Sequence, residues 1–204
     1  FDSLNRVSTI AVYSMPIFWL GMILQIVFGA YLNWLPVSGR ISPTLIPHRI
    51  TGLYLIDSML EGNIPAFLSS VEHLILPVFV LGLWLSTVIN RITRVRMVGV
   101  LSEDFIFAAR ARGLREKTVV YKHALRNALV PVVTIIGLQF ALLLAGAIVT
   151  EVTFSIAGMG QLLVTAIFDR DFPLIQGIVV FYAIIVALIT LVSDISYAYI
   201  DPRI

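Results

Sequence analysis

The chain has 204 residues, of which 59% are hydrophobic and 13% charged, and its formal net charge is +2. A soluble domain has about 45–50% apolar and about 25% charged residues, so this composition excludes an ordinary water-soluble domain. The sequence contains no cysteine, which excludes disulfides, thiolate metal sites and cysteine nucleophiles within it.

Four apolar segments are long enough to cross a bilayer as helices. At a rise of about 1.5 Å per residue, about 20 residues cover a hydrocarbon core of about 30 Å. The predicted spans are residues 10–32, 71–90, 129–150 and 173–197, and the last two contain no Lys or Arg. Four prolines and three glycines punctuate residues 33–70, which predicts an external loop. Within it, LYLIDSMLEG predicts a short helix at the membrane interface.

The basic residues are concentrated in the loop over residues 91–128. Nine of the 14 Lys and Arg residues lie between Arg91 and Arg126. With four spans, this loop lies on the same side as both chain ends, and that side carries eleven basic residues against three on the other. The positive-inside rule therefore predicts that the loop and the C-terminus are cytoplasmic.

The middle of this loop carries the signals of a short helix. Ser102 is followed by Glu103 and Asp104, which suits an N-cap and a first turn whose acidic groups meet the positive end of a helix. Gly113 follows two arginines, which suits a left-handed C-terminus. We therefore expect a helix over about 103–112.

This helix is expected to present a surface of small residues. By i, i+3, i+4 spacing, the residues that lie close on one face are Phe105, Ala108, Ala109 and Arg112. A partner's groove can approach such a surface closely. A second helix is predicted from about residue 116 into the third span, so the loop is anchored to the membrane domain.

The loop resembles the EAA loop of ABC-importer permeases, in the form found in the dipeptide, oligopeptide and nickel permease family. The likeness is carried by FAARARGLREKTVVYKHALRNALVP. Ala108 and Ala109 stand at the alanine positions and Gly113 at the glycine, while Phe107 stands where the general pattern has Glu. The His-Ala-Leu-Arg-Asn-Ala run from His123 is similar to the peptide-permease variant.

This resemblance extends over the whole chain and implies its architecture and location. Further matching stretches surround the first span, follow the third span and close the chain with Asp201-Pro202-Arg203. The implied fold is all-α and integral to the membrane: a single type I ABC-importer permease bundle over residues 1–204. Four spans would be present and two preceding spans lacking. The implied location is the prokaryotic cytoplasmic (inner) membrane.

The resemblance also implies a function and a set of partners. The chain would be a permease subunit that imports peptides, nickel or a related small solute delivered by an extracytoplasmic binding protein. Its partners would be a second homologous permease, two cytoplasmic ABC ATPase subunits, the binding protein and the lipid membrane. The sequence has no P-loop pattern, so no cofactor is expected on this chain, and ATP and Mg would be bound by the ATPase subunits.

Two sets of site residues follow. The expected ATPase-docking loop comprises Glu103, Asp104, Phe105, Ala108, Ala109, Arg110, Arg112, Gly113 and Leu114. Possible gate or pathway residues are Gln139, Glu151, Glu72 and His73. A position at the wet membrane interface, or a hydrogen bond between helices, also accounts for polar residues of this kind. The hydrogen-bond explanation applies to Gln25 as well. No catalytic, cofactor-binding or metal site is predicted, because three scattered histidines do not suit a metal enzyme.

Other functional classes remain as alternatives. One is a secondary transporter or channel, in which the basic loop only fixes the topology or lies on anionic lipid. Such a protein needs ionisable or unwound sites at the midplane and often has inverted repeats. No such repeat is evident in this sequence. A membrane enzyme needs paired catalytic groups within its spans. Nucleic-acid binding is disfavoured, because the loop holds one Tyr and two Phe without a recognised fold to present them.

Overall fold

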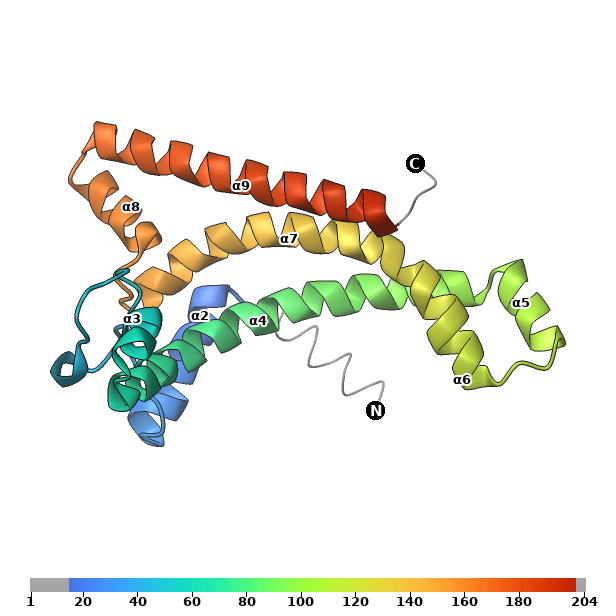
Figure 1. The fold of residues 1–204 in the computed structure, drawn as a ribbon, viewed down its shortest axis with the longest axis horizontal. Coiled ribbons are helices and arrows are strands. Elements are labelled where there is room, and N and C mark those ends of the chain that lie inside the picture. Colours follow the sequence, from blue (N-terminus) through green and yellow to red (C-terminus); the bar gives the residue numbers. More distant parts are fainter. Residues whose placement is uncertain (1–14, 201–204) are drawn as a thin grey trace. The chain divides into compact units, whose positions relative to one another are not determined.

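The computed structural model describes residues 15–200, apart from some side chains in 130–145 and 193–200 (Figure 1). This part of the chain is helical and holds no strand. Three of its helices are long and apolar enough to cross a membrane, over Ile64–Leu101, Ile135–Thr153 and Phe172–Val192. The predicted all-α membrane fold is confirmed.

The described residues form two compact units, and the long helices contribute to both. Within the described residues, the first unit comprises 15–84 and 144–180, and the second comprises 85–143 and 181–200. The three long helices are α4 (Ile64–Leu101), α7 (Leu125–Thr153) and α9 (Phe172–Ile200).

The predicted first span, residues 10–32, begins outside the described residues. Its described portion consists of the eight residues of α2 (Ile17–Leu24) and the seven of η1, a π-helix over Gln25–Tyr31. This helix is apolar but shorter than a full span. The other three predicted spans lie within α4, α7 and α9.

Helix α4 is longer than the predicted span that it contains. It has 38 residues and continues through Pro77, a residue that membrane helices tolerate because neighbouring groups satisfy the freed carbonyl. Residues 91–101, expected to begin the loop, are helical instead. Hydropathy predicts only where the apolar segment of a chain ends. The helix itself continues past that point, because residues such as Arg91 and Arg94 have a high helix propensity.

The first unit has a small apolar core and short connecting elements. Leu76 and Val80 of α4 and Phe154 form its buried centre, and side chains of α2 pack around them. A Cβ at Gly21 would lie 3.2 Å from the Phe154 ring, so glycine allows α2 to approach closely. The remaining elements of this unit are η2 (Pro43–Leu45), α3 (Tyr54–Glu61) and α8 (Met159–Phe168). Figure 1 shows α8 joining the end of α7 to the start of α9.

The second unit contains the basic loop. Its elements after α4 are α5 (Asp104–Ala111), α6 (Glu116–Thr118) and η3, a π-helix over Val119–Ala124 that leads into α7 (Figure 1). Such short helices are marginal in water on their own. They are held by a shared apolar core of Ile106, Ala109, Val119 and Ala124, with Met97, Val100 and Leu101 of α4 packed against it.

Candidate functional site

The start of α5 differs from the predicted cap. The helix begins at Asp104, and the residue before it, Glu103, makes no side-chain cap bond. The Ser102 hydroxyl donates instead to the Gly99 carbonyl oxygen at 2.7 Å. The expectation of a Ser102 N-cap is therefore wrong, because α4 still extends to Leu101 and the serine bonds to that last turn.

The end of α5 has the left-handed glycine that the sequence predicts. Gly113 has φ +75°, and its N–H donates to the Arg110 carbonyl oxygen at 2.9 Å. A Cβ at this position would meet no atom within 4 Å. Glycine is therefore required here by backbone conformation and not by space.

An ion pair bridges the turn after α5. Arg110 Nη2 lies 2.7 Å from Glu116 Oε1, and Arg110 Nε lies 3.2 Å from Glu116 Oε2. The hydrogen bond from Arg110 holds the pKa of the Glu116 carboxyl below its ordinary value and raises the pKa of the guanidinium. Both side chains are largely exposed, so the pair contributes little stability. It nevertheless orients Arg110, one of the residues expected in the ATPase-docking loop, toward its own chain.

The two faces of α5 have different surroundings. Ile106 and Ala109 are 0% and 1% exposed and pack on the apolar core of the loop. The expectation that Ala109 lies on the partner-facing surface is therefore wrong. Small residues suit a buried contact as well as an exposed one, and Ile106 three residues earlier was the sequence signal for the buried face.

The outer side of the loop exposes apolar side chains. Ala108 is exposed, as are Phe105 at 41%, Phe107 at 56% and Leu114 at 38%. These four residues are called the loop surface below. Glu103, Asp104 and Arg112 are also exposed beside it. The loop thus combines an internal core with an uncovered apolar surface.

In the first unit, Glu151 holds the corner between α7 and α8. Its Oε2 accepts hydrogen bonds from the N–H groups of Gly160 at 2.7 Å and Gln161 at 3.1 Å, at the start of α8. A Cβ at Gly158 would collide with this carboxylate, and one at Gly160 would lie 2.5 Å from the Ile148 Cα. Glu151 therefore has a structural role as the cap of α8, and its predicted part in a gate stays a prediction.

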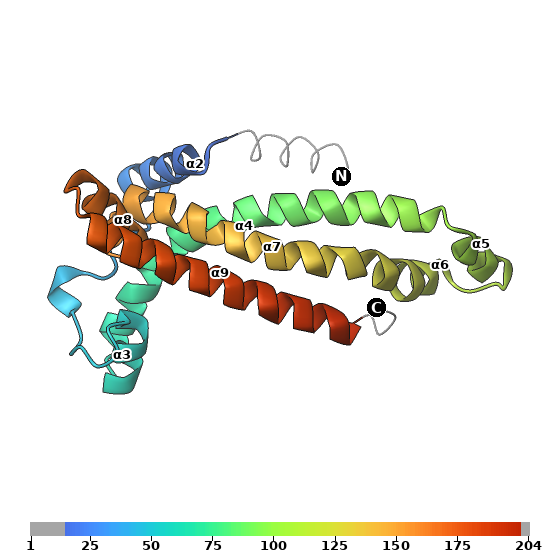
Figure 2. The same cartoon turned by 90° about the horizontal axis from the view of Figure 1, so that it is seen from above.

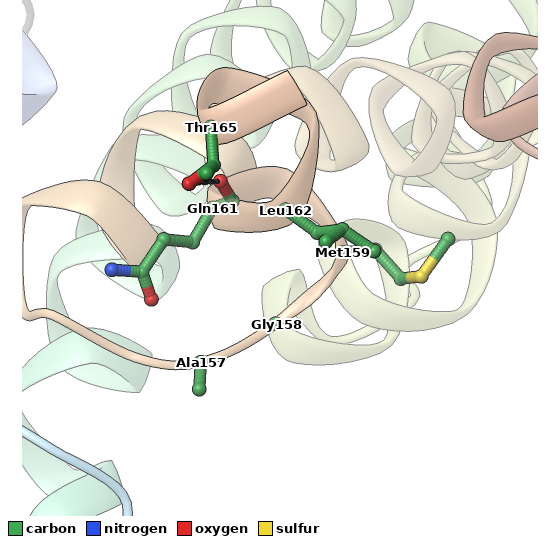
Figure 3. A pocket seen from close by; sticks show the side chains of 6 residues that line it. All are labelled: Ala157, Gly158, Met159, Gln161, Leu162 and Thr165. Atoms are coloured by element: carbon green, nitrogen blue, oxygen red, sulfur yellow. Dashed lines mark hydrogen bonds between the residues drawn. The ribbon is translucent and has the colours of Figure 1, made fainter. Parts of the chain in front are cut away.

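An open hollow of about 480 Å³ lies beside this corner (Figure 3). Its lining carries no charged side chain and consists of Ala157, Gly158, Met159, Gln161, Leu162 and Thr165. The Thr165 hydroxyl donates to the Gln161 carbonyl oxygen at 3.0 Å. Figure 3 shows the Met159 and Gln161 side chains pointing in opposite directions. The lining of the hollow offers no ionisable acid or base.

Two polar residues that the sequence analysis did not single out organise the connecting segment before α3. The Asp57 side chain, 0% exposed, accepts from the Thr51 N–H at 2.7 Å, the Thr51 hydroxyl at 2.6 Å and the Gly52 N–H at 3.0 Å. The Thr51 hydroxyl is the main cause that holds the pKa of this carboxyl below its ordinary value. Arg40 donates to the carbonyl oxygens of Gly52 and Ala157. The donors lie five and six residues before this carboxylate, beyond the reach of the usual aspartate turn signals.

The remaining polar candidates lie on separate elements. Gln25 Nε2 donates to the carbonyl oxygens of Val37 at 2.6 Å and Thr153 at 3.0 Å, so its expected hydrogen bond between segments is confirmed. On α4, Glu72 is exposed and the His73 imidazole bonds to the Ser69 carbonyl of its own helix. Gln139 belongs to the second unit, and its buried Oε1 has no hydrogen-bond partner among the described residues.

The fold and the site define a helical membrane protein with a folded basic loop. The comparison with known families agrees: residues 1–204 match the family described as "Binding-protein-dependent transport system inner membrane component". The chain belongs to this family of ABC-importer permeases. The resemblance drawn from the loop is thereby confirmed.

Curated relatives carry peptide-transport names. The chain is 47% identical over 204 residues to the di/tripeptide transport system permease protein DppB of Pseudomonas aeruginosa (strain UCBPP-PA14). The aligned region covers 100% of this chain and 61% of that protein. It is 47% identical over 195 residues to the dipeptide transport system permease protein DppB of Escherichia coli (strain K12), and the aligned region covers 94% of this chain and 58% of that protein. A third relative is the glutathione transport system permease protein GsiC of Escherichia coli O1:K1 / APEC, which is 40% identical over 203 residues. The aligned region covers 100% of this chain and 57% of that protein. The chain thus spans less than two thirds of the length of each of these relatives.

Proposed function

We propose that this chain is part of the transmembrane permease subunit of an ATP-driven importer for peptides delivered by an extracytoplasmic binding protein. The names of the relatives support peptides as cargo, with nickel or a related small solute as the other possibility within the resemblance. A second homologous permease completes the pathway. Two ATPase subunits bind ATP and Mg on the cytoplasmic side, where the basic loop and the C-terminus lie, and this chain binds no cofactor itself.

The loop surface is the observation that carries the coupling part of this proposal. Phe105, Phe107 and Leu114 remain 38–56% exposed although the same loop buries Ile106 completely. Exposed apolar groups that cluster on a folded element mark an interaction site. A protein groove accounts for them, and the exposed acidic and basic residues beside them supply a polar rim. This surface is proposed to dock on an ATPase subunit.

The packing of α5 supports transmission of movement from that surface. Ile106 and Ala109 pack on Met97, Val100 and Leu101 at the end of α4. On its other side, α5 shares its core with η3, which leads into α7 without a break. Because packed side chains do not deform continuously, a displacement of the loop moves the adjoining turns of both helices.

Docking alone does not drive transport. A shift from 1:99 to 99:1 between inward and outward access requires about 5.5 kcal/mol of differential binding. Contacts that are equally favourable in both states shift no equilibrium. The loop therefore acts as a lever, and the ATP-bound ATPase dimer supplies the free-energy difference.

Uptake by the reconstituted complex tests this function. The full-length permease with its partners would be placed in proteoliposomes, and uptake of a radiolabelled dipeptide would be measured with an ATPase-dead partner and, separately, with a collapsed proton gradient. We expect uptake to require the active ATPase and to persist without the gradient. Uptake that persists with the dead ATPase and disappears with the gradient would instead indicate a secondary transporter. Flux that needs neither would indicate a channel.

A further inference from the structure

Helix α3 presents an apolar face that no part of the described chain covers. Ile56, Met59 and Leu60 lie on one side by i, i+3, i+4 spacing and are 42%, 64% and 62% exposed. On the other side, Asp57 and Ser58 are both 0% exposed. We propose that α3 is an interfacial helix whose apolar face lies in the lipid at the membrane surface, the orientation that such an amphipathic helix adopts on a bilayer.

The charges of α3 are arranged for this position. The Asp57 carboxylate is saturated by donors from Thr51 and Gly52, on the side away from the apolar face. Glu61, at the end of the helix, bonds to the side chain and the N–H of His48. Tyr54–Glu61 contains no Lys or Arg. Neither carboxylate of the helix therefore has to be drawn into lipid when the apolar face is buried there.

The membrane is the occupant that the neighbouring chain indicates. Helix α3 ends at Glu61 with Gly62 as its C-cap, and Asn63 caps the next helix by accepting from the Ala66 N–H at 3.1 Å. That next helix is α4, which is itself long and apolar enough to cross the membrane. Figure 2 shows α3 turned across the direction of α4 and not continuing it. A short helix that leaves a membrane span at a steep angle is placed at the level of the lipid headgroups.

The exposed apolar surface continues from α3 onto the first turns of α4. Ile64 is 67% exposed and Leu68 is 54% exposed, and neither side chain has an apolar cover within the first unit. Only Gly62 and Asn63 separate α3 from α4. We therefore assign the same lipid to both surfaces.

This anchor has a consequence for the segment that precedes it. Asp57 ties α3 to Thr51 and Gly52, and Arg40 ties the Gly52 carbonyl to that of Ala157 in the α7–α8 connection. A helix held in the interface therefore fixes the depth of these connecting segments relative to the bilayer. Through the hydrogen bond from Arg40 to Ala157, the same anchor also fixes the depth of the connection between α7 and α8.

Spin labels report the environment of this face directly. The sequence has no cysteine, so Met59→Cys and Leu60→Cys each give a single labelling site once any cysteine elsewhere in the full-length permease is replaced by serine. Thr44→Cys, on an exposed residue of η2, is the matched aqueous control. The complete transporter would be placed in nanodiscs of phosphatidylethanolamine and phosphatidylglycerol. Collision rates with oxygen and with a water-soluble nickel chelate would then be measured, and ATP hydrolysis would confirm that each variant is folded.

The two collision rates distinguish lipid from water and from protein. We expect the labels at residues 59 and 60 to collide preferentially with oxygen and the label at residue 44 with the nickel chelate, so that their depth parameters have opposite signs. Equal access of the nickel chelate to residues 59 and 44 would overturn the proposal. It would also fall if residue 59 became protected only after the binding protein was added, because the face would then be a protein-docking surface.

Discussion

The connecting segments of the first unit are fixed by polar side chains that bond to backbone atoms, whereas the short helices of the loop in the second unit are held by a small apolar core. Asp57, Arg40 and Glu151 each bond to two or more backbone groups in the first unit. The loop instead buries Ile106 and leaves neighbouring aromatic side chains exposed. Directional bonds fix one geometry, whereas an apolar core beside exposed apolar side chains leaves a surface that we propose a partner covers. We therefore assign shape to the first of these parts and association to the second.

The largest expected effect comes from removing the core of the loop. Ile106→Ala leaves a cavity at a side chain that is 0% exposed, and such changes cost about 2–5 kcal/mol. Hydrogen exchange of the α5 amides should therefore become much faster. Phe107→Ala, on a side chain that is 56% exposed, is the control: it should leave exchange nearly unchanged but weaken association with the ATPase. Equal exchange in both variants would remove the distinction between core and surface.

The corner at α8 offers the next largest effect. A methyl group at Gly160 would lie 2.5 Å from the Ile148 Cα, and such overpacking costs about 1–3 kcal/mol. Gly160→Ala should lower the melting temperature of the permease in nanodiscs. Gly177→Ala, on α9 where a Cβ meets no atom within 4 Å, should not lower it. If Gly160→Ala left the melting temperature unchanged, the packing between the start of α8 and Ile148 would not be as close as the structure indicates.

A smaller effect is expected at the end of α5. Gly113 has φ +75°, and a left-handed conformation costs other residues about 1–2 kcal/mol. Gly113→Ala should therefore reduce ATP-driven uptake while membrane insertion continues. Gly99→Ala adds the same methyl group to helical backbone with equally open space and should leave uptake unchanged. Normal uptake by the residue 113 variant would show that the coupling does not depend on this turn.

The smallest effect is confined to acid pH. The pKa of Asp57 in the folded protein lies below its ordinary value of 3.8, so its contribution to stability is present above that value and is lost as the pH falls toward the lower one. Between about pH 6 and about pH 3, the melting temperature of the wild type should fall more than that of Asp57→Asn. Parallel curves for the two proteins would mean that the charged carboxylate contributes nothing to the connecting segment.

The sequence predicted the loop better than the first unit. The short helix and its terminal glycine follow from local signals around Glu103 and Gly113, and both are present. The inward position of Ala109 was missed, because alanine suits core and surface alike. Arg40 was missed for a different reason: its acceptor Ala157 lies 117 residues away, and no local pattern marks such a pair. Hydropathy also placed the end of the α4 span near residue 90, although the helix continues to Leu101.

Disulfide crosslinking tests most directly whether the loop surface is the ATPase-docking lever. The full-length permease would carry Phe107→Cys or, as the buried control, Ala109→Cys, together with ATPase subunits that have single cysteines along their docking groove. We predict that residue 107 crosslinks, that the yield changes with ATP, and that residue 109 does not crosslink. The account would be contradicted if residue 107 formed no crosslink although the subunits co-purified and both thiols reacted with a small maleimide.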